Sequence, residues 1–282
     1  MTRTIPGMPE DAEVPARYDG LAEGYARHWG PVIRPAAEAV LDRLHGRLPP
    51  EPRILDVGTG TGTLALRALE RWPGARVTGV DASDAMLALA GEAADRRLAS
   101  HVAARFARHA AMAAHLPFED RAFDAAVSSF VLQLVPSRSA ALREIRRVIT
   151  PGGWLAWVTW LVGGEPFRGD EVVDDVLDEF GFDPPERDDR SGDLASVAAA
   201  ADATRRAGFR EVRAEAGVLS HRWTAEDYAA FITDFDEQGT FESLDPGERH
   251  RAVRRLLERL RGLDDGDLTM RLPIVYVRGA AR

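Results

Sequence analysis

Between residues 36 and 160, short apolar runs alternate with segments whose apolar positions recur every three or four residues. The short runs predict buried strands and the longer segments predict amphipathic helices. Alternation of this kind is typical of an α/β fold with parallel strands joined by helices. The strands are predicted at residues 54–57, 75–80, 103–107, 125–129 and 155–160, and the helices at 36–48, 64–71 and 85–97.

Beyond residue 160 the same two periods continue with longer spacings. An alanine-rich segment predicts a helix at 194–207 that ends at Gly208. The other helices are predicted at residues 170–180, 225–237 and 246–263, and two further strands at 209–220 and 268–277.

A glycine-rich turn follows the first predicted strand. Residues 54–62 are Ile-Leu-Asp-Val-Gly-Thr-Gly-Thr-Gly, and the second strand ends on Asp81. Glycines let backbone pass close to a ligand, and a carboxylate at the end of the next strand can hold a ribose diol. The third glycine of a dinucleotide fingerprint is replaced by Thr63, and no lysine follows for a P-loop. The turn therefore predicts a nucleotide-type pocket without a phosphate site.

This run resembles the first motif of class I S-adenosylmethionine-dependent methyltransferases. Other segments resemble that family in order and spacing between about residues 15 and 160. They are Tyr18-Asp19 with Ala22 and Tyr25, residues 80–83 with Met86-Leu87, residues 116–118, residues 123–129, and Thr150-Pro151-Gly152-Gly153. The resemblance implies a Rossmann-like, mostly parallel seven-stranded sheet with helices on both faces. It also implies an antiparallel last strand and a helical lid.

The resemblance implies S-adenosylmethionine as the cofactor and S-adenosylhomocysteine as its product. Asp81 would take the ribose hydroxyls, and Met86 would pack on adenine. Where many relatives carry an acid for the adenine amino group, this chain has Met112. The residues expected at the cofactor are Tyr18, Tyr25, Asp56, Gly58, Thr59, Gly60, Gly62, Asp81, Ala82, Met86, Met112, Ala113, Ser128 and Ser129.

Two stretches of the chain, residues 161–193 and 224–266, extend beyond the minimal core of that family. Residues 1–35 are expected to form lid helices and 36–160 the cofactor-binding core. Residues 161–193 would form an acidic cap insertion, and 194–282 the remainder of the core with a helical cap insertion at 224–266. Because open α/β sheets bind ligands at the carboxyl ends of their strands, we expect the acceptor there. Its expected lining is Gln133, Trp157, Trp160, Trp223 and Tyr228.

A general base is not evident from the sequence. Gln133 stands where relatives often have histidine after the fourth strand, and an amide can only orient a substrate. His28 and His221 are the histidines that could face the acceptor, since imidazole is the usual base near neutral pH. The acids between 170 and 175 lie on one predicted helix face, so no required metal is expected.

The negative charge is concentrated in one stretch. Residues 165–193 contain twelve acids and three arginines. The net charge of this stretch is therefore −9, the same as that of the whole chain. The remainder is nearly neutral and offers no basic face for phosphates, so a nucleic-acid partner is not expected. The basic residues between 249 and 261 are interpreted as a solvated helix face.

The remaining composition is that of a globular enzyme. The chain has no cysteine, which excludes disulfides and thiolate chemistry. Residues 1–16 contain no apolar run, and no stretch approaches the ~20 apolar residues of a membrane span. A cytoplasmic monomer or homodimer with a small-molecule acceptor and no membrane partner is the default expectation.

These observations predict a methyltransferase that moves a methyl group to oxygen, carbon or nitrogen of a small, apolar or aromatic molecule by in-line displacement. Two alternatives remain open. One is a Rossmann-like oxidoreductase that uses a nicotinamide cofactor, and the other is a protein that keeps the fold and the cofactor but transfers no methyl group.

Overall fold

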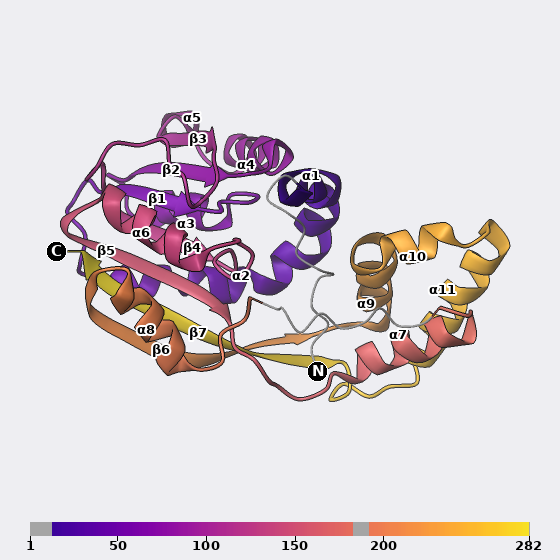
Figure 1. Cartoon of the computed structure of the whole chain (residues 1–282). Helices are drawn as coiled ribbons and strands as arrows, with labels where there is room; N and C mark the ends of the chain where they lie inside the picture. The colour runs from indigo at the N-terminus through magenta and orange to yellow at the C-terminus, as the bar shows by residue number, and fades with distance from the viewer. Residues whose placement is uncertain (1–12, 183–191, 282) are drawn as a thin grey trace.

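A computed structural model describes residues 13–182 and 192–281 of the chain. They form a seven-stranded sheet in the order β3-β2-β1-β4-β5-β7-β6 (Figure 1). Strands β1 to β5 pair in parallel, and β7 is antiparallel to both β5 and β6, as predicted. The strands are β1 (Arg53–Val57), β2 (Arg76–Asp81), β3 (Phe106–Ala110), β4 (Phe123–Ser129), β5 (Ile149–Trp160), β6 (Phe209–Arg222) and β7 (Thr269–Ala281).

Helices cover both faces of this sheet and so form a three-layer, Rossmann-like core. One apolar core lies between the sheet and the helices α6 and α8, and the other lies against α2, η2 and α3. The helices of the core are α2 (Gly30–Glu38), α3 (Thr63–Arg71), α4 (Asp84–Arg97), α5 (Ser100–Ala103), α6 (Arg138–Val148) and α8 (Val197–Arg206), with the 3₁₀ segment η2 (Leu41–Leu44).

The remaining helices lie over and beyond the carboxyl ends of the strands. Two π-helical segments, η1 and η3, directly continue α1 and α9. These elements are α1 (Glu13–Gly24), η1 (Tyr25–Trp29), α7 (Arg168–Glu179), α9 (Ala225–Phe231), η3 (Ile232–Asp236), α10 (Gln238–Ser243) and α11 (Pro246–Leu260). We call α1 with η1 the lid, and α7 with α9 to α11 and η3 the cap.

Several predicted elements have different bounds in the structure, and the fifth strand begins at Ile149, six residues earlier than predicted. The third strand begins three residues later than predicted, and the short helix α5 occupies Ser100–Ala103. Strand β3 is exposed along most of its length, so it lacks the apolar run that marks the other parallel strands. The helix predicted at 36–48 instead begins at Gly30, passes through Pro35, and is followed by the 3₁₀ segment η2.

The two cap insertions pack on each other, as Figure 1 shows for α7 and α11. Arg255 Nε of α11 donates to Glu179 Oε2 of α7 at 2.9 Å, and Arg259 lies 3.3 Å from Asp175. Part of the acidic insertion therefore neutralises the basic helix, and the interpretation of that helix as only a solvated face was incomplete. Inside the cap, the Tyr228 hydroxyl donates to Asp170.

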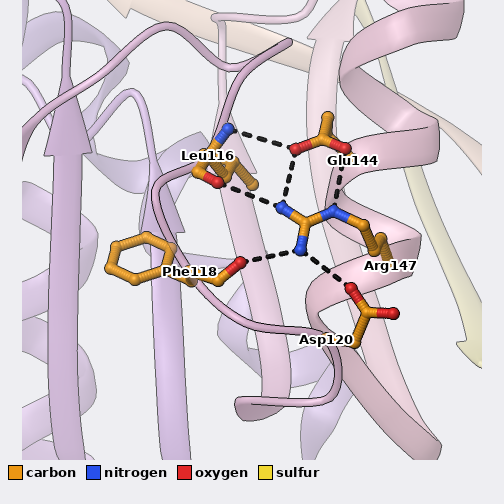
Figure 2. A network of polar contacts seen from close by, with 5 residues as sticks. All are labelled: Leu116, Phe118, Asp120, Glu144 and Arg147. Atoms are coloured by element: carbon orange, nitrogen blue, oxygen red, sulfur yellow. Dashed lines mark hydrogen bonds and ion pairs between the residues drawn. The ribbon is translucent and has the colours of Figure 1, made fainter.

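The loop between β3 and β4 is held by one arginine of α6 (Figure 2). Arg147 donates to the backbone oxygens of Phe118 and Leu116 at 2.7 and 3.0 Å, and it pairs with Glu144 and Asp120. Glu144 in turn accepts the Leu116 N–H at 3.2 Å. Both carboxylates raise the pKa of Arg147, so the guanidinium stays charged. This network fixes the loop that follows the third strand end.

Replacing this arginine should loosen the loop. Arg147→Ala leaves two backbone carbonyls and Glu144 without their charged donor, and we expect the free energy of unfolding in urea to fall by about 1.5–3 kcal/mol. Arg143→Ala, at an exposed position of the same helix, is the control and should change it by less than about 0.5 kcal/mol. Equal losses in the two variants would mean that the network contributes little.

Candidate cofactor and acceptor site

The glycine turn after β1 has its backbone fixed by the neighbouring strand. The N–H groups of Gly58 and Thr59 both donate to the Val80 oxygen at 2.8 Å. Gly58, Gly60 and Gly62 have left-handed φ angles of 69°, 52° and 86°, which side chains other than glycine rarely adopt. A Cβ built on Gly60 would meet no atom within 4 Å. The turn therefore presents bare backbone to open space at Gly60, whereas Gly58 packs closely against Val131.

Asp56, at the end of β1, holds the turn from beneath. Its Oδ2 accepts from the Thr59 hydroxyl at 2.8 Å and from the Ala65 N–H of α3 at 3.1 Å. The other oxygen, Oδ1, is buried and has no hydrogen-bond partner. Burial raises the pKa of Asp56 to about 7, against the effect of these hydrogen bonds. Gly79 makes room for the arrangement, since a Cβ there would lie 2.7 Å from the Thr59 hydroxyl.

Asp81, at the end of β2, holds the turn from the other side. Its Oδ2 accepts the Gly60 N–H at 2.8 Å, and its Oδ1 accepts the Ser83 N–H at 3.0 Å. Burial raises the pKa of this carboxyl while the backbone donors oppose the rise. Ala82 is half-buried beside it, and the Met86 side chain is buried within the first turn of α4. The structure thus brings both predicted acids to one glycine turn.

The lid carries two tyrosines that were expected near the cofactor, and both are half-buried. Burial raises the pKa of Tyr25, and Tyr18, Asp81 and Asp56 raise it further. The Tyr25 hydroxyl therefore lies within electrostatic reach of both acids. Because α1 also packs beside α4, the lid approaches the site from the side of the second strand (Figure 1).

The third and fourth strand ends complete this edge of the sheet. The Ala111 N–H donates to the backbone carbonyl oxygen of Asp81 at 2.9 Å, which brings the half-buried Met112 and the buried Ala113 next to β2. The Ser128 hydroxyl donates to the Val57 oxygen at 2.8 Å and so joins β4 to β1. Ser129 is half-buried at the end of β4.

A series of aromatic rings extends from the sheet to the cap, and sequence reasoning missed two of its members, Phe130 and Trp29. The Phe130 ring stacks on Trp160 with centroids 4.1 Å apart, and Trp160 lies 6.2 Å from Trp29 of η1. Trp29 stacks on Phe231 of the cap at 5.5 Å. We call Phe130, Trp160, Trp29 and Phe231 the aromatic series. Two features of the sequence could have indicated them. Phe130 directly follows β4, and Trp29 lies one helical turn after Tyr25.

Phe130 has a left-handed φ of 54°, unusual for a residue other than glycine. Its N–H donates to the Val158 oxygen of β5 at 3.0 Å, which holds it in this conformation. Strained backbone of this kind is concentrated at binding sites, where the surrounding structure maintains it. The strain thus lies where β4 delivers an aromatic ring to the carboxyl edge of the sheet.

Three residues predicted to line the acceptor pocket serve the core instead. Trp157 is fully buried on the α6 and α8 face, because side chains alternate along β5 and its neighbours Val158 and Ala156 face the other core. Tyr228 is buried inside the cap, and its hydroxyl donates a hydrogen bond to Asp170 of α7. Trp223 is buried behind Phe231, 5.1 Å from that ring.

Gln133, predicted both as a pocket residue and as a weak catalytic candidate, is also tied into the structure. It is 6% exposed, and its Oε1 accepts from the Thr159 hydroxyl at 2.8 Å. A side chain held in this way stabilises the segment after β4, which argues against a catalytic role. Of the predicted pocket residues, Trp160 alone is half-buried and belongs to the aromatic series.

The two candidate bases lie around the lid and the cap. His28 Nε2 of η1 is buried without a hydrogen bond and lies 4.0 Å from Asp234 of η3. The His221 ring contacts Trp223 at 4.5 Å. Burial lowers the pKa of both histidines, while Asp227 acts against this in each case. Both imidazoles are therefore neutral near pH 7, the form that can accept a proton.

The described residues, 13–182 and 192–281, contain neither a cluster of metal ligands nor a membrane-spanning helix. In this part of the chain no group of three or more His, Cys, Asp or Glu side chains could hold a metal ion. Among the same residues, none of the helices has the length and apolarity needed to cross a bilayer.

The cofactor implied by the sequence fits the residues present. The open space at Gly60 lets a ligand lie against the backbone, and the Asp81 oxygens retain lone pairs for a ribose diol. The unpartnered Asp56 oxygen beside the turn suits a ligand that carries positive charge, as a sulfonium with an ammonium group does. The lid tyrosines lie on the same side.

Comparison with known proteins agrees with this fit. Residues 55–157 match the methyltransferase domain family. The chain is 31% identical over 225 residues to the malonyl-(acyl-carrier protein) O-methyltransferase of Geobacter sulfurreducens, covering 79% of each chain. It is 46% identical over 103 residues to the demethylmenaquinone methyltransferase of Thermus thermophilus. That match covers 36% of this chain and 44%, less than half, of the relative.

The fold also matches solved structures along its whole length. The crystal structure of the 4+2 cyclase SpnF superposes with a TM-score of 0.62 and 21% identity, covering 99% of both chains. At this identity the likeness concerns the fold.

The raised pKa of Asp56 predicts a pH dependence of stability. Because the folded pKa of about 7 exceeds the ordinary value of 3.8, the folded state binds more protons between these values. Stability contributed by this group should therefore fall as pH rises from 4 to 8, by on the order of 4 kcal/mol. Asp56→Asn keeps an oxygen acceptor but cannot ionise, so urea unfolding of this variant should lack that part of the decline. If the free energy of unfolding falls with pH equally in the wild type and in Asp56→Asn, the raised pKa of Asp56 is wrong.

Proposed function

Because the chain belongs to the class I S-adenosylmethionine-dependent methyltransferases, we propose that it transfers a methyl group to a small, planar and apolar acceptor at the carboxyl ends of β4 and β5. The aromatic series is the observation that carries this proposal. It joins the strand ends of the sheet to the lid and the cap, next to the proposed cofactor site.

On the cofactor side, the chain supplies binding and orientation. Gly60 provides a backbone cradle, Asp81 takes the ribose, and Asp56 places negative charge near the cationic part of the ligand. The bound cofactor supplies an activated methyl group on its sulfonium. Holding an acceptor atom about 3–3.5 Å from that carbon supplies much of the acceleration that such a reaction needs.

On the acceptor side, Trp160 and Trp29 are half-buried, whereas their partners Phe130 and Phe231 are buried. The two indoles therefore supply the contact surface, and the buried rings hold them in place. Flat aromatic surfaces favour planar and apolar ligands, which stack on them at low entropic cost. Quinols, phenols and related rings have this shape.

The proton of a hydroxyl acceptor needs a base. His28 is the stronger candidate of the two neutral histidines because it belongs to the same π-helical segment as Trp29. Asp234, 4.0 Å from Nε2, would stabilise the imidazolium that forms. An amine acceptor that binds uncharged would not require this step before transfer.

A second acceptor class has its own support. The relative that matches 79% of each chain is named for O-methylation of a malonyl group on a carrier protein. Methylation of a carboxylate on a carrier-bound acyl chain is therefore the alternative within the same reaction class. A carboxylate is already ionised, so this reaction would need no base.

The first test is calorimetric titration with S-adenosylhomocysteine, with NADH as the control for the oxidoreductase alternative. One-to-one binding of the homocysteine compound alone supports the cofactor assignment, whereas binding of NADH alone overturns it. Labelled S-adenosylmethionine is then incubated with a demethylated naphthoquinol, a catechol and a malonyl thioester on carrier protein. Mass spectrometry of the labelled product identifies the acceptor class. Tight cofactor binding without labelled product on any of them favours a protein that does not transfer the methyl group.

Asp81 offers a residue-level test of the cofactor site. Asp81→Ala removes the proposed ribose acceptor and the acceptor of the Gly60 N–H. We expect calorimetry to show S-adenosylhomocysteine binding weakened by about 1.5–3 kcal/mol, roughly 10- to 150-fold in Kd. Asp84→Ala, an exposed acid three residues later, is the control and should bind normally. Unchanged affinity in folded Asp81→Ala would exclude the proposed role of β2.

A further inference from the structure

Asp19 of the lid contacts the core, although it is outside the set of residues expected at the cofactor. Its Oδ1 accepts from the Ser83 hydroxyl at 2.6 Å and from the Ala85 N–H at 3.1 Å. Ser83 is the N-cap residue of α4 and Ala85 belongs to its first turn, and both lie more than sixty residues along the chain. The lid therefore supplies a carboxylate to the N-terminus of another helix, where unpaired N–H groups and the helix dipole favour an anion.

This contact continues into the proposed ribose site. Ser83 is fully buried, and its hydroxyl accepts the Met86 N–H at 3.1 Å while donating to Asp19. The Ser83 N–H donates to Asp81, whose other oxygen accepts from Gly60. A continuous chain of hydrogen bonds thus joins the lid to the carboxylate and to the glycine turn. Displacement of the lid would break the hydrogen bonds of Asp19, which form one end of this network.

The contact is also suited to opening. Asp19 is exposed on α1, so water can replace its two donors when the lid moves away. Its hydrogen bonds to Ser83 and Ala85 lower the pKa of Asp19, so it remains ionised at neutral pH. The following segment packs on the cap, since a Cβ on Gly24 would lie 2.9 Å from the Phe235 ring. The lid is thus attached to the core at Asp19 and to the cap beyond Gly24.

We propose that Asp19 is a positioning residue that latches the lid over the cofactor and sets how fast the cofactor leaves, without contacting it. The proposal rests on the proposed function for the identity of the cofactor. It assigns regulation of access to one exposed carboxylate in the lid. The second attachment at the cap allows α1 to swing away while the segment after it stays in place.

The test compares three variants in the full-length chain. Asp19→Ala removes the acceptor, and Asp19→Asn keeps an oxygen that can accept from both donors. Glu23→Ala removes an exposed acid from the same helix and is the matched control. The first readout is dissociation of labelled S-adenosylmethionine, chased with unlabelled S-adenosylhomocysteine. The second is hydrogen exchange of the backbone amides of residues 18–24 without ligand.

We expect Asp19→Ala to release the cofactor about tenfold faster than the wild type, the effect of losing hydrogen bonds to a charged group. Asp19→Asn should recover most of this change, and Glu23→Ala should behave like the wild type. Amide exchange in the lid should rise in Asp19→Ala above the level of the control. A release rate equal to that of Glu23→Ala overturns the latch, even where Asp19→Ala unfolds at a lower temperature.

The two proposals fail in different ways. If the wild type binds S-adenosylhomocysteine but Asp19→Ala matches the control, the latch is wrong and the cofactor assignment stands. If the wild type binds neither cofactor form, the cofactor assignment is wrong. In that case hydrogen exchange decides whether Asp19 holds the lid, and equal protection in Asp19→Ala and Glu23→Ala rejects it.

Discussion

Two carboxylates, the buried Asp56 and the half-buried Asp81, hold one left-handed glycine turn, and the rest of the site depends on this arrangement. Asp56 binds the turn to the start of α3, and Asp81 binds the middle of the turn to β2. Among the residues that the structure describes, no arginine pairs with either acid, and both are held by N–H and O–H donors. Burial raises the pKa of both groups, and two acids without a cationic partner favour a cationic ligand.

The lid and the cap lie next to this edge of the sheet and contact each other through aromatic side chains. Figure 1 shows the cap beyond the long strands β6 and β7, which reach it from the core. The aromatic series joins β4 and β5 to both, and the strained Phe130 begins it. Strain and aromatic packing thus occur together at the strand ends where open α/β sheets bind ligands. Asp56 and Asp81 lie at one part of this edge and the aromatic series at another, so the edge has a polar and an apolar half.

The differences between prediction and structure have local physical causes. Strand β3 is exposed for most of its length, so its pattern carries little signal, and its predicted start was three residues early. Trp157 and Tyr228 were predicted to line a pocket because both are aromatic and near the expected mouth, yet strand alternation and the Asp170 contact place them in cores. Gln133 was predicted as a pocket residue from its position alone, whereas its Oε1 accepts a hydrogen bond from the Thr159 hydroxyl. The type of a residue does not show whether its side chain is buried or which distant residue it contacts.

The sequence by itself determined the alternation of strands and helices, the glycine turn and the acid at the end of the second strand. These features are local, because periodicity, left-handed glycines and a strand-terminal carboxylate act within about ten residues. Only the tertiary structure decided which aromatic rings meet, which histidines face the cap acids, and that Asp19 reaches Ser83. Those pairs are separated by many residues along the chain, and their contacts arise from how the lid, sheet and cap pack.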